Sequence, residues 1–150
     1  MNRFFCTIPG DPRGKGSVRV YNRHAVKDAK TESYMGRAIF AMTEARAGTP
    51  TRDGVFDVEI NAYLRRPASL IPKARARTEQ PPAGAFPAWC KPDADNIAKI
   101  ILDCLTQSGV INDDKRVAVL VVRKWWAPVD GDVRVDVVVE QLFVGWPPSP

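Results

Sequence analysis

The chain has 150 residues, of which 45% are hydrophobic and 26% are charged, as in an ordinary globular protein with one core. No apolar run approaches the ~20 residues of a membrane-spanning helix, and the apolar part of the N-terminal segment is too short for a signal peptide. Three cysteines without a C-x-x-C pair and a single histidine argue against a zinc site or a disulfide framework. We therefore expect one cytoplasmic domain over residues 1–150, with no membrane partner.

The formal net charge of +5 is unevenly distributed. Residues 65–91 carry six basic side chains against Glu79, and residues 13–30 carry six against Asp28. This distribution indicates a polyanionic partner, although a charge run is as often a solvated face. The side chains expected to contact such a partner are Lys15, Arg19, Arg65, Arg66, Lys73, Arg75, Arg77 and Lys91.

The first half of the chain predicts a strand, a helix and a second strand. Residues 3–9 are aromatic and β-branched and end at a Pro-Gly pair, which indicates a strand. The glycine-rich segment 10–19 lacks the spacing of a P-loop, so no nucleotide cofactor is expected. Residues 55–64 alternate polar and apolar types and predict a strand that pairs with the first one. A helix is predicted from residue 27 to about 47, with an apolar stripe of Tyr34, Ala38, Ile39, Met42 and Ala45.

The second half predicts a long loop, a helix and two strands. Residues 65–92 contain six of the 13 prolines without periodicity, as in a functional loop. Residues 116–126 and 133–143 are predicted to pair as a hairpin, and residues 145–150 are expected to form a frayed tail. The order of elements predicts a single α+β domain whose mixed, mainly antiparallel sheet has two helices on one face. The second helix is predicted from about 94 to 106, with an apolar stripe of Ile97, Ile100, Ile101, Cys104 and Leu105.

The segment KPDADNIAKIILDCL, residues 91–105, combines this second helix with acidic residues. Asp93 precedes its first turn and Asp95 lies within it, while Asp114 follows the helix after a turn that is long enough to return to the N-terminal end. Carboxylates that converge ~4 Å apart would repel each other by about 4 kcal/mol at an effective dielectric of about 20, so they would require a cation. Mg²⁺ suits such a site, and Mn²⁺ can substitute for it. Lys99, one turn after Asp95, would then be placed to stabilise charge on a phosphate.

The same residues also have purely structural interpretations. Asp93 fits an N-cap, and Asp95 in the first turn favours the helix dipole by ~0.3–1 kcal/mol. Asp95 and Lys99 fit an i, i+4 ion pair worth ~0.2–0.5 kcal/mol, with Asp103 as a further partner of Lys99 rather than a ligand. His24 is expected to be structural or incidental. Spacing alone therefore leaves capping and metal binding both open.

KPDADNIAKIILDCL, followed by GVINDDKRVAVLVVRKWW, resembles the signature of the RusA family of Holliday junction resolvases. In that signature, D-x-D-N-x-x-K lies on a helix and a D-D pair opens a strand; the resemblance covers about residues 90–126. It implies a magnesium-dependent, homodimeric endonuclease that resolves four-way DNA junctions and is common in phages and prophages. By matching position, it makes Asp93, Asp95 and Asp114 the essential carboxylates, with Asp113 as a possible further ligand, and Lys99 the essential lysine.

The function expected from the sequence is therefore structure-selective cleavage of DNA through metal-activated water. One alternative is a catalytically inert DNA-binding accessory protein of recombination, in which the aspartates cap a helix and only the basic loops matter. A weaker alternative is a metal-dependent phosphohydrolase of small molecules, against which the basic loops argue.

Overall fold

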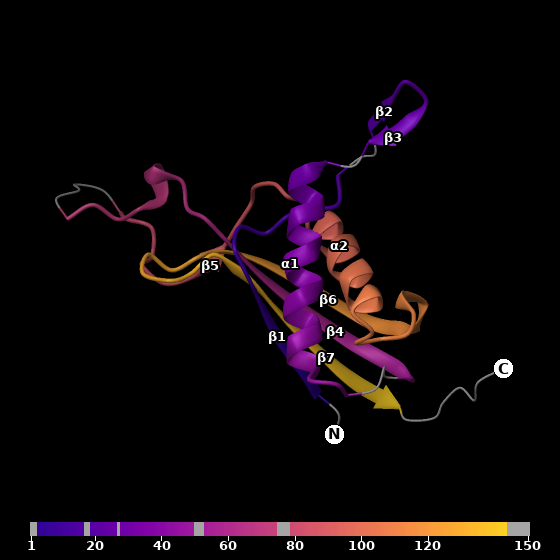
Figure 1. Cartoon of the computed structure of the whole chain (residues 1–150). Helices are drawn as coiled ribbons and strands as arrows, with labels where there is room; N and C mark the ends of the chain where they lie inside the picture. The colour runs from indigo at the N-terminus through magenta and orange to yellow at the C-terminus, as the bar shows by residue number, and fades with distance from the viewer. Residues whose placement is uncertain (1–2, 17–18, 27, 50–52, 75–78, 144–150) are drawn as a thin grey trace.

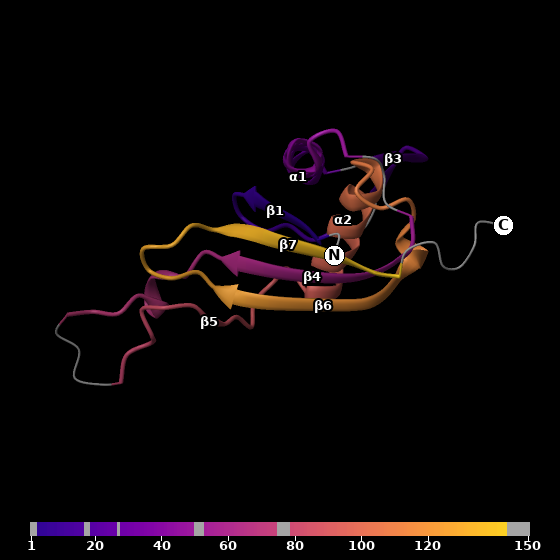
Figure 2. The same ribbon diagram turned by 90° about the horizontal axis from the view of Figure 1, so that it is seen from below.

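Two helices cover one face of a five-stranded sheet in the computed structural model, which describes residues 3–16, 19–26, 28–49, 53–74 and 79–143 (Figures 1 and 2). Strand order is β1-β7-β4-β6-β5, and only β4 and β6 run parallel. The prediction of a mixed, mainly antiparallel α+β domain is confirmed. The elements of this layer are β1 (Arg3–Pro9), α1 (Ala29–Arg46), β4 (Val55–Leu64), β5 (Phe86–Pro87), α2 (Ala94–Gln107), β6 (Val117–Trp126) and β7 (Arg134–Phe143).

The core lies between the sheet and the helices, as the apolar periodicity predicts. Alternate residues of β4 are buried from Phe56 to Leu64, and the five apolar residues predicted for α2 are all buried. In α1, Ala45 is exposed, so its place in the predicted stripe is wrong. The half-buried position of the last turn belongs instead to Arg46, whose guanidinium donates to the carbonyl of Gly109 at 3.3 Å. Among the described residues, no helix is long and apolar enough to cross a membrane.

The predicted strand pairings are wrong in two places. β6 and β7 do not pair as a hairpin, because β4 lies between them, parallel to β6 and antiparallel to β7 (Figure 2). Likewise β7 separates β1 from β4. Periodicity shows which face of a strand is buried, but it does not show which strand lies alongside. The connection through α2 returns the chain to a parallel neighbour of β4, as helical crossovers do.

Two features project beyond this layered body. A hairpin of β2 (Arg19–Tyr21) and β3 (His24–Val26) extends past the helix ends (Figure 1). Its turn residues Asn22 and Arg23 have φ of 48° and 65°, and without an Asn-Gly pair the sequence does not reveal it. The predicted long loop contains β5 and a 3-10 turn at Ala68–Leu70; most of it extends from the sheet as an arm, here residues 67–74 and 79–85 (Figures 1 and 2). The expected frayed tail, 145–150, lies outside the described residues.

Candidate active site

The N-terminus of α2 presents the first acidic side chain to solvent. Asp93 occupies the N-cap position, and its carbonyl accepts the first helical hydrogen bond from the amide of Ile97 at 3.1 Å. Its carboxylate, however, makes no capping hydrogen bond. The preceding segment is fastened to the sheet, because the ammonium of Lys124 donates to the carbonyls of Cys90 and Pro92. The backbone therefore fixes Asp93 while its side chain stays available.

One turn further along α2, Asp95 and Lys99 form the predicted i, i+4 ion pair. Their Oδ2 and Nζ atoms are 3.1 Å apart, and both side chains are exposed. The hydrogen bond from Lys99 holds the pKa of Asp95 below its ordinary value, so this carboxylate is ionised at neutral pH. Asp103 does not join them, because it binds the ammonium of Lys15 at 2.6 Å; its predicted pairing with Lys99 is wrong.

The acidic pair after the helix lies at the opposite end of α2. Asp113 caps a 3-10 turn, Asp114–Arg116, and accepts a hydrogen bond from the amide of Lys115 at 3.0 Å. That bond and the Lys115 ammonium lower the pKa of Asp113. Asp114 opens the turn and is exposed.

The polypeptide between α2 and this turn does not run back along the helix. Instead the amides of Val110 and Ile111 bond to the carbonyl of Leu105, at 3.0 and 3.3 Å, which folds the segment onto the C-terminal end of α2. Since α2 has 14 residues at ~1.5 Å each, Asp114 lies about 20 Å from Asp93. The route along β6 gives a similar separation, since Lys124 beside Pro92 is seven residues from Val117 at ~3.3 Å each.

The predicted metal ligands divide into two groups in this geometry. Exposed carboxylates such as Asp93 and Asp95 are the hard oxygen donors that Mg²⁺ and Mn²⁺ prefer. Within the described part of the chain, however, no group of three or more His, Cys, Asp or Glu side chains could hold a metal ion. A single chain therefore brings together Asp93, Asp95 and Lys99, but neither Asp113 nor Asp114.

A basic trough leads from the base of the arm to Asp93. It consists of two adjoining shallow hollows that share Pro12 and Lys91. The first reaches Arg65 and Arg66 at the end of β4, and the second reaches Asp93. Its basic side chains are Arg13, Lys15, Arg65, Arg66 and Lys91.

The glycine-rich segment forms one wall of this trough by packing against α2. The amide of Lys15 donates to the carbonyl of Asn96 at 3.0 Å. A Cβ atom at Gly14 would lie 2.9 Å from side-chain carbons of Pro92 and Asn96, so this close approach requires glycine. Glycine at this position thus serves contact with the helix that carries the acids.

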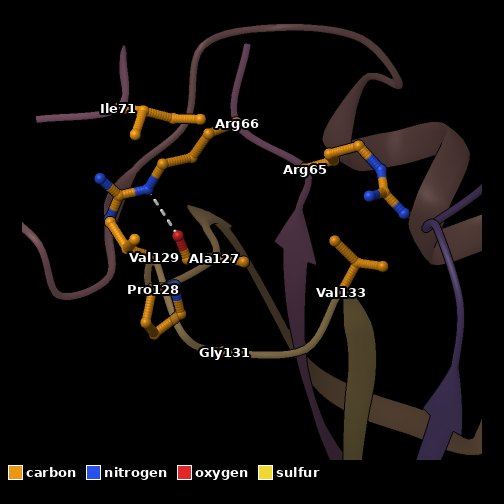
Figure 3. Close-up of a pocket in the computed structure, with 8 residues that line it drawn as sticks. All are labelled: Arg65, Arg66, Ile71, Ala127, Pro128, Val129, Gly131 and Val133. Carbon is orange, nitrogen blue, oxygen red and sulfur yellow. Dashed lines mark hydrogen bonds between the residues drawn. The ribbon is translucent and has the colours of Figure 1, made fainter. Parts of the chain in front are cut away.

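The other predicted contact residues have different surroundings. Arg65 is exposed and pairs with Asp11 at 3.3 Å, whereas Arg66 is half-buried and donates to backbone carbonyls (Figure 3). Lys73 is exposed in the arm. The backbone of Arg19 begins β2, while Arg75 and Arg77 lie outside the described residues.

The exposed carboxylates at the N-terminus of α2, the lysine one turn on and the adjoining basic trough fit one class of protein. This class is the metal-dependent enzymes that cleave phosphodiesters of nucleic acids. The family model for the endodeoxyribonuclease RusA matches residues 9–140, so the chain belongs to this family. It is a Holliday junction endodeoxyribonuclease, a phosphodiester hydrolase of recombination and not an inert accessory protein, and its family is metal-dependent. A search of curated proteins gives no match.

Proposed function

We propose that Asp93, Asp95, Lys99 and Asp114 are the residues with which this enzyme cuts four-way DNA junctions. The observation that carries the proposal is the exposed Asp93–Asp95–Lys99 group at the N-terminus of α2, inside the matched range 9–140. Lys99 is placed to neutralise the charge that develops on the scissile phosphate. Its ion pair with Asp95 keeps the ammonium on the exposed side of the helix until substrate arrives.

Mg²⁺ is the proposed cofactor, with Mn²⁺ as a substitute, held by Asp93 and Asp95 with Asp114, and with Asp113 as an additional candidate ligand. When bound, a divalent cation supplies Lewis-acid activation of water and phosphate. Asp95 suits this role because its carboxylate is exposed, and Asp93 suits it because no capping bond occupies its carboxylate. The alternative role of both residues as dipole-stabilising acids is compatible with metal binding, since both use the same exposed helix end.

The basic trough is the proposed path of the DNA strand that enters the active centre. Lys91, Arg65 and Lys15 line it on the way to Asp93, and Lys73 extends the basic surface into the arm. Phosphate contacts of this kind release counterions, so we expect junction affinity to fall by about 0.9 log units per contact for each tenfold rise in salt. Arg19, Arg75 and Arg77 are proposed to add contacts on the basis of their sequence alone.

A homodimer is the proposed working form, because one chain separates Asp114 from Asp93 by about 20 Å. Among the described strands, β5 covers only Trp125 and Trp126 of the outer edge of β6, and residues 117–123 of that edge carry no partner strand. An open apolar edge of this kind favours pairing with another chain. Antiparallel pairing of two such edges aligns the start of one β6 with the end of the other.

This pairing accounts for the position of the distant carboxylate. Asp114 precedes the start of β6, and the end of β6 holds Pro92 through Lys124. A two-fold axis near Leu120 therefore carries Asp114 of the partner subunit toward Asp93 and Asp95. Each of the two active centres would then take residues from both chains, and the two symmetric centres match the two incisions that a four-way junction requires.

The cytoplasm is the proposed location, which would be that of a bacterial host if a phage or prophage encodes the enzyme. This proposal is supported by the substrate, because an enzyme of DNA recombination must be in the compartment that contains the DNA.

Cutting of a synthetic four-way junction tests the catalytic assignment. Wild type with Mg²⁺ is expected to cut it, and Asp95→Asn is expected to lose at least about 100-fold in rate while still binding the junction in Ca²⁺. Asp103→Asn is the matched control, because Asp103 is on the same helix but binds Lys15. It should keep most of the activity.

Each failure in this assay has its own meaning. If the wild-type protein binds the junction but does not cut it in the presence of any divalent metal, the cutting function is contradicted. Equal rates for wild type and Asp95→Asn would instead reject the site assignment, and equal cutting of linear duplex would remove the selectivity for junctions.

A further inference from the structure

Two adjacent arginines at the end of β4 point to opposite sides of the strand (Figure 3). Both line the basic trough, but the side chain of Arg65 is 71% exposed and forms an ion pair with Asp11. Arg66 enters the base of the arm and is half-buried. The sequence gives no sign of this difference, since both are basic residues in a basic segment.

The guanidinium of Arg66 has all of its donors engaged. Its Nε donates to the carbonyl of Ala127 at 2.6 Å, in the connection between β6 and β7 (Figure 3). Its terminal nitrogens donate to four carbonyls of the arm, those of Leu70, Pro82, Ala83 and Gly84, at 3.2, 2.5, 3.0 and 2.5 Å. An arginine has five N–H donors, so none remains for a DNA phosphate.

These contacts tie three pieces of backbone together. One piece is the outgoing part of the arm, at Leu70, and another is its returning part, at 82–84. The third is the connection between β6 and β7, where the amide of Val129 also donates to the carbonyl of Ala83 at 2.9 Å. In addition, the guanidinium carbon lies 4.9 Å from the ring centre of Phe86, a cation–π contact that fixes its plane.

We propose that Arg66 is a positioning residue that fixes the base of the arm by holding its described parts, 67–74 and 79–85, together, so that Lys73 meets the DNA from a backbone that is already in place. This inference rests on the proposed DNA contacts of the arm and assigns Arg66 a role different from that of Arg65. Ordering both parts of the arm before binding removes part of the entropy cost that a free loop would bear on contact with DNA. Arg66 thus acts through Lys73 without touching the substrate.

Lysine and glutamine substitutions separate this role from direct phosphate binding. Arg66→Lys keeps the charge, but an ammonium has three donors and cannot reach five carbonyls in one plane. We therefore expect Arg66→Lys and Arg66→Gln to weaken junction binding in Ca²⁺ to the same degree. The slope of log affinity against log salt should also become shallower, by up to about 0.9 for each DNA phosphate that the arm no longer binds.

A double-mutant cycle supplies the decisive comparison. Its second variant, Lys73→Gln with Arg75→Gln and Arg77→Gln, removes the basic side chains of residues 67–85. In that background Arg66→Gln should weaken binding no further, whereas Arg65→Gln should weaken it as much as in wild type. An equal effect of Arg66→Gln in both backgrounds would overturn the proposal, and so would wild-type affinity of Arg66→Lys.

Hydrogen exchange without DNA tests the same contacts independently of function. In Arg66→Gln, the amide of Val129, which donates to the carbonyl of Ala83 in the returning part of the arm, should exchange about tenfold faster, with no change in the core of α2. The same result in Arg65→Gln, or none in Arg66→Gln, contradicts the role of Arg66. If exchange behaves as expected but wild type fails to bind junctions, the proposed function fails and the role of Arg66 in holding the arm stands.

Discussion

Residues of one type have unlike roles in this protein because their surroundings differ. The three cysteines show this most simply. Cys6 and Cys104 are buried in the core, while Cys90 is half-buried and lines the basic trough. Burial, assisted by the negative charge of Asp136, raises the pKa of Cys6 to about 11, and burial with Asp103 nearby raises that of Cys104 to about 12.

These surroundings predict which thiol reacts. At pH 8 about 0.1% of Cys6 and about 0.01% of Cys104 would be thiolate, so neither should be alkylated quickly by iodoacetamide. We expect one modified residue in the native protein, Cys90, and three in denaturant, as measured by mass spectrometry. Junction DNA in Ca²⁺ should slow the labelling of Cys90 because that residue lines the trough. Labelling of Cys6 before Cys90, or no protection by DNA, would contradict the prediction.

At the scale of elements, the sequence predicts the type of secondary structure of each segment better than its position in the fold. The apolar stripe of α2, from Ile97 to Leu105, is predictable in full because its period depends only on the segment itself. The place of β4 between β6 and β7 is not, because strand neighbours are set by packing across the whole sheet. The same limit applies to Arg66, whose partners at Leu70, Pro82 and Ala127 are not adjacent to it in sequence.

The free edge of β6 is the element that the proposed dimer uses. Leu120, at the centre of its unpaired part, is 42% exposed, so Leu120→Lys should leave the fold intact while placing two ammonium groups together at the two-fold axis. We expect a dimer for wild type and a monomer for Leu120→Lys in sedimentation velocity, with loss of junction cutting. Val129→Lys, at a similarly exposed residue in the connection after β6 and outside its unpaired edge, is the control. A Leu120→Lys dimer that cuts normally would exclude this edge as the interface.

For the whole molecule, the question is whether an active centre lies within one chain or between two. The carboxylates at the two ends of α2 are about 20 Å apart, which is also about the length of β6 from Val117 to Lys124. If the β6 strands of two subunits pair antiparallel, the start of one strand lies beside the end of the other. The separation of about 20 Å within one chain is then offset by an equal displacement along the partner strand. No rearrangement within the chain is needed, and the buried stripe of α2 stays in place.

Mixing inactive variants distinguishes the two arrangements. Asp95→Asn and Asp114→Asn should each be inactive, yet a shared-site heterodimer has one centre with both defects and one with none. An equal mixture should therefore recover about one quarter of wild-type centres, and it should nick junctions rather than resolve them. Asp93→Asn mixed with Asp95→Asn is the control and should recover nothing, because those residues come from the same chain. If tagged subunits exchange but Asp95→Asn with Asp114→Asn stays inactive, the centre is not shared between chains.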